Sequence, residues 1–170
     1  MSAIRWEAHG DRAAVHELLS RAFPSDAEAR LVDALRGRTQ PQVSLVAEDA
    51  IAGVIGHILF TPVEIRARAE GFRAIALGPM AVLPESQRKG VGSALVEAGL
   101  AACAAIGEHT VFVLGHPDYY PRFGFRPAWD YGCYYRAAGP NPAFMVRELE
   151  RGALRGRAGE VVYDAAFGSL

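Results

Sequence analysis

Apolar side chains recur along this chain at two different spacings. Residues 11–22, 26–36 and 93–106 carry them at helical spacing, and Gly37 is placed to end the second of these helices. Residues 49–51 separate two strand-like runs in the manner of a hairpin. The order of elements predicts an α/β (α+β) fold, a mixed sheet with helices on its faces. Strands are predicted over residues 4–7, 43–48, 52–60, 74–83, 110–114, 144–149 and 161–163. Residues 61–65 are an optional extension of the strand 52–60.

The strand-like run over residues 74–83 is interrupted by Gly78 and Pro79. Proline has no N–H to donate to a strand ladder and is confined to strand edges, strand starts and bulges. Either the strand is irregular at Pro79 or it begins at Met80, and the pattern leaves both open. Pro84 ends the run.

Residues 87–92 (Gln-Arg-Lys-Gly-Val-Gly) form a glycine-punctuated loop between this strand and the Ala-rich helix. The first turn of a helix has unpaired N–H groups and a partial positive charge, which together favour phosphate binding. Gly90 and Gly92 have no Cβ atom to keep a ligand at a distance, and Arg88 and Lys89 add positive charge. The loop therefore predicts a phosphorylated cofactor.

Two common phosphate loops do not fit this spacing. A Walker A loop requires Gly-Lys-Ser or Gly-Lys-Thr at its end, and neither follows Gly92. The dinucleotide fingerprint Gly-x-Gly-x-x-Gly is also absent from the loop. The alternative without any ligand is a tight turn from strand to helix.

Composition narrows the class of protein. The 170 residues predict one domain, 1–170, and the net charge of −1 argues weakly against a nucleic-acid partner. Cys103 and Cys133 have neither a disulfide framework nor a metal-ligand spacing, so no metal is expected. The first residues lack the apolar core of a signal peptide, and the most apolar window, 91–106, is too short for a membrane span. A cytoplasmic protein with no membrane partner is expected.

Two segments carry a family resemblance. Residues 83–92, placed between a strand and a helix, resemble the acetyl-coenzyme A motif Gln-x-x-Gly-x-Gly of the GNAT superfamily of N-acetyltransferases. Residues 120–125 (Tyr-Pro-Arg-Phe-Gly-Phe) resemble a later family segment, in which a tyrosine precedes a Gly-Phe pair by four residues. The string 114–125 is similar to a bacterial subgroup of predicted acetyltransferases. The resemblance implies a single GNAT-like domain whose mixed central sheet is flanked by helices and has splayed central strands.

This resemblance also implies the function. The expected enzyme is an acyltransferase that moves an acetyl group from acetyl-CoA, its cosubstrate, to a primary amine of a small molecule or peptide. Pro79 would help to cause the bulge at which the two central strands diverge. The diphosphate would bind the loop, and the pantetheine arm would pair with the end of the preceding strand. The implied cofactor-binding residues are Met80, Ala81, Val82, Gln87, Arg88, Lys89, Gly90, Val91, Gly92 and Ser93.

Tyr120 occupies the family position of the general acid that protonates the leaving thiolate. A phenol has a reference pKa of ~10, above the ~8.5 of a thiol, so it still holds its proton at neutral pH. Tyr119 could take this role if the register differs by one residue. Pro121 disfavours helical geometry at Tyr120, although the family commonly has a helix before this tyrosine. A backbone N–H near Ala81 or Val82 is the implied donor to the oxyanion.

The sequence indicates the general base, which would take a proton from the amine, less clearly than it indicates the general acid. His116 is nearest to the expected site, and histidine is the residue type that most readily exchanges a proton near neutral pH. A chain of water molecules to the solvent is an alternative. The other candidate bases are Glu48, His57, Glu85 and Asp118.

The acceptor is not identified by the sequence. In the family, the segment corresponding to residues 20–28 and the late strands shape its groove, which makes Phe23, Glu28 and Tyr134 candidates. A non-catalytic CoA-binding regulatory or interaction module and a binder of nucleotide phosphates are the rival functions. The chain could be a monomer or a homodimer, with residues 161–163 and Phe167 either capping the sheet or meeting a second subunit.

Overall fold

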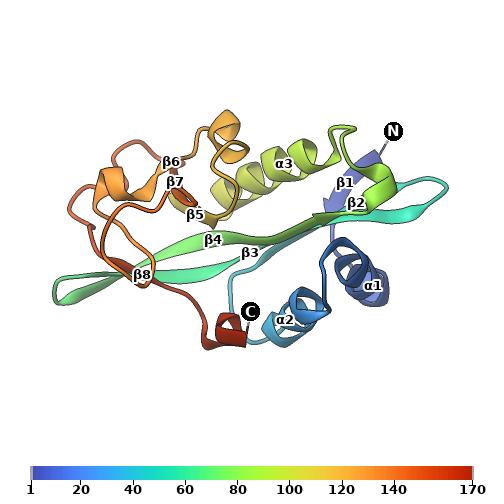
Figure 1. The fold of residues 1–170 in the computed structure, drawn as a ribbon, viewed down its shortest axis with the longest axis horizontal. Coiled ribbons are helices and arrows are strands. Elements are labelled where there is room, and N and C mark those ends of the chain that lie inside the picture. The colour runs from blue at the N-terminus through green and yellow to red at the C-terminus, as the bar shows by residue number, and fades with distance from the viewer. Residues whose placement is uncertain (1, 170) are drawn as a thin grey trace.

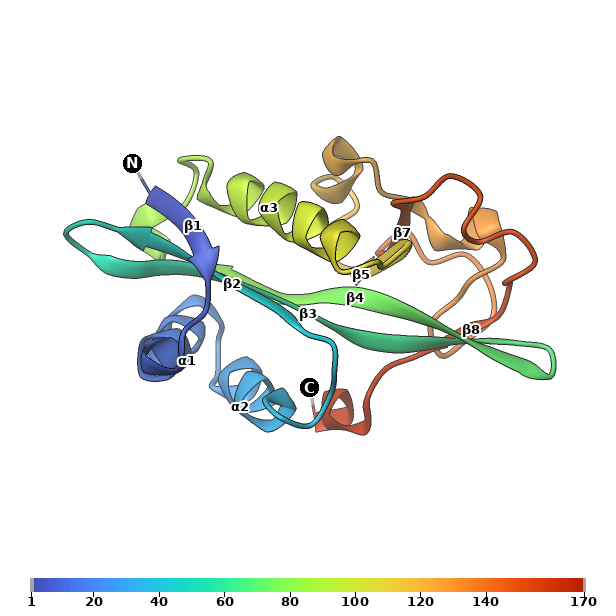
Figure 2. The same cartoon turned by 180° about the vertical axis from the view of Figure 1, so that it is seen from behind.

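The computed structural model describes residues 2–169, which form a mixed sheet of eight strands covered by helices on both faces (Figure 1). Helices α1 (Arg12–Ala22) and α2 (Ala27–Leu35) lie on one face, and α3 (Val91–Ala105) lies on the other (Figure 2). This arrangement confirms the predicted fold class. The strands are β1 (Ser2–Trp6), β2 (Val43–Asp49), β3 (Gly53–Ala67), β4 (Glu70–Val82), β5 (Thr110–Leu114), β6 (Arg126–Pro127), β7 (Phe144–Glu148) and β8 (Glu160–Val162).

The strands are ordered β1-β2-β3-β4-β5-β7-β6, and β8 joins β3 outside this path. The pair β4–β5 is parallel, whereas the pairs on either side of it are antiparallel. The long β3–β4 hairpin runs through the whole molecule (Figure 2). β8 pairs with residues 64–66, so the C-terminal segment returns to the sheet beside the far end of the β3–β4 hairpin (Figure 1).

The helices bury the faces that their periodicity predicts. Val15 and Leu18 of α1, Leu35 of α2, and Leu95 and Val96 of α3 are all at most 1% exposed. Burying a side chain of this size stabilises the fold by about 1.5–3 kcal/mol. No helix within residues 2–169 combines the length and the apolar character needed to cross a membrane.

Several element boundaries differ from the sequence prediction. Strand β3 extends to Ala67 and β4 begins at Glu70, because the two strands pair with each other over this polar stretch. Helix α3 begins at Val91, inside the expected loop. Its N-cap, Gly90, has a φ of 83°, a left-handed conformation that glycine adopts without the steric strain of a Cβ atom.

The strand β4 is continuous through Pro79, but its pairing with β3 shifts there. Ile58 pairs with Met80, whereas Phe60 pairs with Leu77, so the segment containing Pro79 carries one residue more than its partner strand. The prediction of an irregular strand is confirmed, and the alternative in which the strand begins at Met80 is wrong. Proline tolerates this position because a bulge leaves one N–H out of the ladder.

Candidate active site

The candidate site lies where β4 and β5 separate. The two strands pair only over residues 75–77 and 111–113. Beyond Leu77, β4 continues to Val82, still paired with β3 on its other side, while β5 ends at Leu114 and the chain turns away. The predicted splay of the central strands is confirmed. It leaves backbone groups of residues 80–82 without a strand partner on the β5 side.

A hollow of about 530 Å³, hereafter the loop hollow, lies between this strand end, the glycine loop and the start of α3. Within residues 2–169 no side chain caps the N-terminus of α3, so the N–H groups of residues 91–93 have no partner within the helix. Gly92 and Ser93 line the hollow. Arg88, with a φ of 60°, is left-handed like Gly90, and such residues turn successive N–H groups toward the inside of a loop. The loop hollow is therefore suited to an anion.

The side chains of residues 87–93 do not all face the loop hollow. Gln87 ties the loop to the strand end, since its Nε2 donates to the Val82 carbonyl at 3.0 Å. Lys89 donates from Nζ to the Glu85 carbonyl at 3.0 Å, and Val91 is buried in the core; neither lines the loop hollow. The residues of the predicted cofactor set that do line it are Met80, Ala81, Val82, Gln87, Arg88, Gly90, Gly92 and Ser93.

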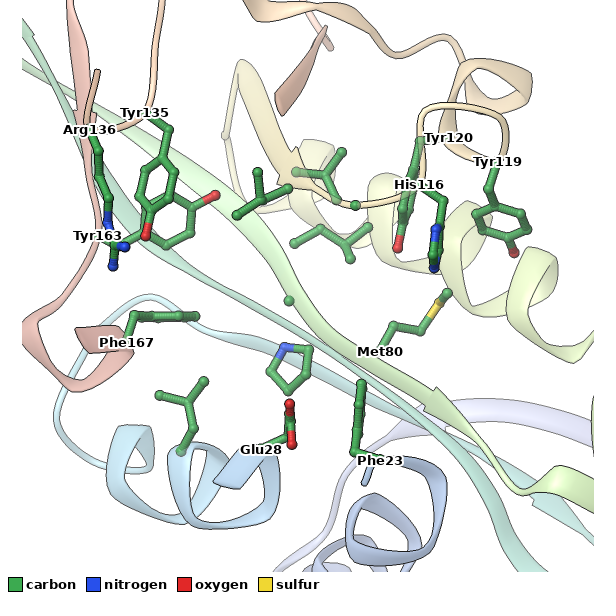
Figure 3. A pocket seen from close by; sticks show the side chains of 17 residues that line it. Phe23, Glu28, Met80, His116, Tyr119, Tyr120, Tyr135, Arg136, Tyr163 and Phe167 are labelled. Carbon is green, nitrogen blue, oxygen red and sulfur yellow. The ribbon is translucent and has the colours of Figure 1, made fainter. Parts of the chain in front are cut away.

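A second hollow of about 610 Å³, hereafter the acceptor cavity, opens on the other side of the strand separation (Figure 3). Its volume is within the usual range for small-molecule sites. Met80 and Tyr119 line both hollows, so the two meet there. Most of the lining is apolar or aromatic: Phe23, Glu28, Leu31, Leu77, Gly78, Pro79, Met80, Val113, Leu114, Gly115, His116, Tyr119, Tyr120, Tyr135, Arg136, Tyr163 and Phe167.

Tyr120 is a buried side chain at the start of a short 3-10 helix, and its hydroxyl points into the acceptor cavity (Figure 3). The ring fits against Gly115, where an added Cβ would lie 2.5 Å from a ring carbon. Phe125 packs edge-on against it, with the ring centroids 5.7 Å apart. Burial raises the pKa of Tyr120 to about 12. Pro121 is the second residue of the 3-10 helix, so the expected departure from an α-helix occurs here.

Tyr119 is oriented differently. It is partly exposed, and its hydroxyl oxygen lies against the first turn of α3, 3.1 Å from the position that a Cβ of Gly92 would occupy. The Arg122 guanidinium lies 4.7 Å from the centre of its ring, and both residues line the loop hollow. The loop pattern alone contains no sign of these two contributors.

His116 is exposed and lines the acceptor cavity beside Tyr120 (Figure 3). The other predicted bases do not line this cavity. Glu48 and Glu85 form ion pairs with Arg5 and Arg21, at 2.8 Å and 3.0 Å. The remaining two are His57, which is buried with its Nε2 2.9 Å from Ser44 Oγ, and the exposed Asp118.

Among the acceptor candidates, Phe23 and Glu28 line the cavity. Tyr134 does not: its ring packs against Trp129 at 6.3 Å, and the next residue, Tyr135, lines the cavity instead. The one-residue error arises because this segment is irregular, so that no helical or strand period indicates which side chain faces inward.

Three further residues of the cavity wall were not assigned to it from the sequence: Arg136, Tyr163 and Phe167. Tyr163 follows β8, and Phe167 lies in the C-terminal turn after it. Tyr163 and Phe167 reach the cavity because the strand that precedes them, β8, pairs with β3. The residue types of 161–163 (Val-Val-Tyr) predicted a strand but contained no signal for its partner.

Comparison with known proteins places these features in a family. Residues 4–128 match the acetyltransferase (GNAT) domain family. The uncharacterized N-acetyltransferase YhbS of Escherichia coli K12 is 37% identical over 164 residues, which are 96% of this chain and 97% of that protein. The uncharacterized N-acetyltransferase YjhQ of the same organism is 40% identical over 135 residues, 78% of this chain and 73% of YjhQ.

Solved structures agree with these matches. The crystal structure of E. coli YhbS in complex with CoA has a TM-score of 0.89 at 36% identity, covering 98% of this chain and 92% of that one. A GNAT acetyltransferase of Brucella melitensis in complex with acetyl-CoA has a TM-score of 0.78 at 31% identity, covering 98% of both chains. These matches confirm the resemblance seen in residues 83–92 and 120–125: the chain belongs to the GNAT family of acetyltransferases.

Proposed function

We propose that the protein transfers the acetyl group of acetyl-CoA to a primary amine of a small molecule or peptide, with residues 1–170 acting as one cytoplasmic N-acetyltransferase domain. The observation that carries this proposal is the separation of β4 from β5, which brings the two hollows together at Met80 and Tyr119. The structures of YhbS with CoA and of the Brucella protein with acetyl-CoA support the choice of donor. The proposal includes no metal, nucleic-acid or membrane partner, and it allows a monomer or a homodimer.

The loop hollow would bind the donor. Its diphosphate would accept hydrogen bonds from the uncapped N–H groups of residues 91–93, and Arg88 adds positive charge at the rim. The amides of the pantetheine arm would pair with the backbone of residues 80–82, because that side of β4 has no strand partner. The thioester would then lie near Met80 and Tyr119, where the acceptor cavity begins.

In the reaction, the neutral amine attacks the thioester carbonyl carbon, forming the C–N bond and a tetrahedral oxyanion. A backbone N–H near Ala81 or Val82 would donate a hydrogen bond to this oxyanion. When the oxyanion collapses, the C–S bond breaks, and the electron pair leaves with the sulfur. Tyr120 would give its phenolic proton to that sulfur and then regain a proton from solvent.

Tyr120 is favoured over Tyr119 as the acid because its hydroxyl points into the acceptor cavity, and because burial raises its pKa to about 12. It therefore keeps its proton over the whole neutral range. The hydroxyl of Tyr119 lies against α3, where it suits contact with the donor. His116 would take the proton that the amine loses, since it is the predicted base that lines the cavity.

The proposal is tested by two measurements. Acetyl-CoA should raise the melting temperature of the protein, whereas ATP and NAD should not, because only a ligand of the folded state stabilises it. CoA release should then depend on added primary amine. Absence of a melting shift with millimolar acetyl-CoA would contradict the donor assignment, and a shift without amine-dependent CoA release would favour the non-catalytic CoA-binding module.

A further inference from the structure

Two side chains of the acceptor cavity have buried oxygen atoms without a hydrogen-bond partner. They are Oε2 of Glu28 and the hydroxyl of Tyr163. A buried polar atom without a partner destabilises a fold by about 1–3 kcal/mol, so it calls for an explanation. Both residues line one cavity, and a ligand that displaces the side-chain atoms covering these oxygens would supply both missing partners.

Glu28 lies in the first turn of α2, and its carboxylate points into the cavity near Phe23 (Figure 3). No ion pair within residues 2–169 involves this carboxylate. A primary amine is an ammonium ion at neutral pH, since its reference pKa is ~10. The ammonium would complete the hydrogen bonds of Glu28 and be held near Met80, where the donor and acceptor hollows meet.

Positive charge lies at the other end of the cavity. The guanidinium of Arg136 lies 4.9 Å from the centre of the Tyr135 ring, and in Figure 3 these side chains stand with Tyr163, away from Tyr120 and His116. In the part of the chain that the structure describes, Arg136 has no carboxylate partner. Asp164, which lies nearby, is paired with Arg38 at 2.8 Å.

Tyr163 adds a second donor at this end. Its ring packs edge-on against Tyr135 and Phe167, with centroid distances of 5.2 Å and 5.1 Å. Burial raises the pKa of Tyr163, so its hydroxyl keeps its proton and can donate it. Among residues 2–169, this guanidinium has no carboxylate partner and this hydroxyl has no hydrogen-bond partner, so both match the acceptor oxygens of a carboxylate or a phosphate.

We propose that the acceptor is a small zwitterion with an apolar or aromatic body: a primary ammonium held by Glu28, the body against Phe23, Tyr135 and Phe167, and a carboxylate or phosphate at Arg136 and Tyr163. This inference rests on the proposed acetyl transfer and names the substrate class of the same site. Glu28, Arg136 and Tyr163 select the acceptor. The bound ammonium gives one proton to His116 and so becomes the neutral nucleophile, and His116 passes that proton to solvent. After the C–N bond forms, the nitrogen loses its second proton by the same route, while Tyr120 protonates the departing sulfur.

A matched series of phenylalkyl primary amines tests this proposal. Its members carry a methyl, carboxylate, phosphate or ammonium group at the para position of the ring. The wild-type protein should acetylate the carboxylate or phosphate member with a kcat/KM about tenfold or more above that of the methyl member, and the ammonium member should be the poorest. Comparing carboxylate with phosphate decides which anion fits.

Variants link the preference to the named residues. Arg136→Gln should bring the ratio of anionic to methyl member close to one, and Tyr163→Phe should lower it about threefold. Arg151→Gln removes an exposed charge outside the cavity and should leave the ratio unchanged. Glu28→Gln should raise KM about tenfold for every member, whereas Glu17→Gln, on the exposed side of α1, should not.

The outcomes separate this inference from acetyl transfer itself. Equal kcat/KM for the methyl and anionic members, or a preference that survives Arg136→Gln, contradicts the acceptor class while the transferase proposal stands. If no member is acetylated, binding to the CoA-loaded protein is measured by melting temperature. Arg136-dependent binding without turnover supports the ligand class and contradicts transfer. Absence of binding by the anionic members contradicts the ligand class.

Discussion

The loop hollow and the acceptor cavity meet at Met80 and Tyr119, but different parts of the chain build them. The loop hollow comes mainly from the continuous segment 80–93 and includes the uncapped backbone N–H groups at the start of α3. The acceptor cavity is lined by side chains from segments as far apart as Phe23 and Phe167. A backbone site suits a chemical group that never changes, such as a diphosphate. A side-chain site can change its ligand by substitution, so the acceptor can differ among relatives while the donor stays the same.

The largest effect is expected at Tyr120, which lines the acceptor cavity next to the point where the two regions meet. Tyr120→Phe should lower kcat about 10²- to 10³-fold, because the leaving thiolate loses its proton donor. The affinity for acetyl-CoA should change little, since the hydroxyl points into the acceptor cavity rather than the loop hollow. Steady-state kinetics and a melting-temperature titration measure the two quantities. In Tyr119→Phe, kcat should be affected less; the reverse order would assign the acid to Tyr119.

A substitution at Gly115, which packs against the Tyr120 ring, should lower kcat more than it weakens acetyl-CoA binding. In Gly115→Ala the new Cβ would lie 2.5 Å from the Tyr120 ring, so the ring must move. We expect roughly a 30-fold loss of kcat, within the ~10²-fold that a 1 Å displacement can cause. Unfolding free energy should fall by about 1–3 kcal/mol from overpacking. Gly10→Ala, where the Cβ would meet open space, is the control for both measurements, kcat and urea denaturation.

The loop hollow is tested by the left-handed glycine at the N-cap of α3. Gly90→Ala should raise the dissociation constant of acetyl-CoA about tenfold, because the Cβ disfavours the φ of 83° that orients the first-turn N–H groups. Gly37→Ala is a close control: its φ is 72°, its Cβ also meets open space, and it lies outside both hollows. Equal losses of affinity in the two variants would mean that the effect is on stability alone.

The smallest effect is expected when the positive charge of Arg88, at the rim of the loop hollow, is removed. Arg88→Gln should weaken acetyl-CoA binding about two- to threefold at low salt, since exposed charge pairs contribute little and are screened. The difference from wild type should disappear at about 1 M salt. Arg12→Gln, which removes an exposed charge from α1, should leave the affinity unchanged. A loss that persists at high salt would point to a direct hydrogen bond from Arg88.

The difference between the loop hollow, built from one continuous segment, and the acceptor cavity, built from distant segments, explains which parts of the fold and of the site could be predicted from the sequence. The helices, most strands and the loop follow from local patterns: apolar period, glycine and proline placement, and the free N–H groups of a helix start. The bulge at Pro79 followed from its missing N–H. By contrast, Tyr135 lies in an irregular segment, and Tyr163 reaches the cavity through the pairing of β8 with β3. Such long-range pairing leaves no mark in the local sequence, so the part of the cavity wall around Tyr135 and Tyr163 could not be predicted from it, whereas Phe23 and Glu28 could.

The separation of β4 from β5 has a consequence for aggregation as well. An unpaired strand edge normally invites pairing with another chain, and proteins protect such edges. Here the unpaired side of residues 80–82 lines a hollow enclosed by the start of α3, Tyr119 and Arg122. A flexible ligand with amide groups can enter and complete the ladder, whereas a strand of a second protein would have to displace these elements. The fold thus keeps an open edge for a cofactor while shielding it from self-association.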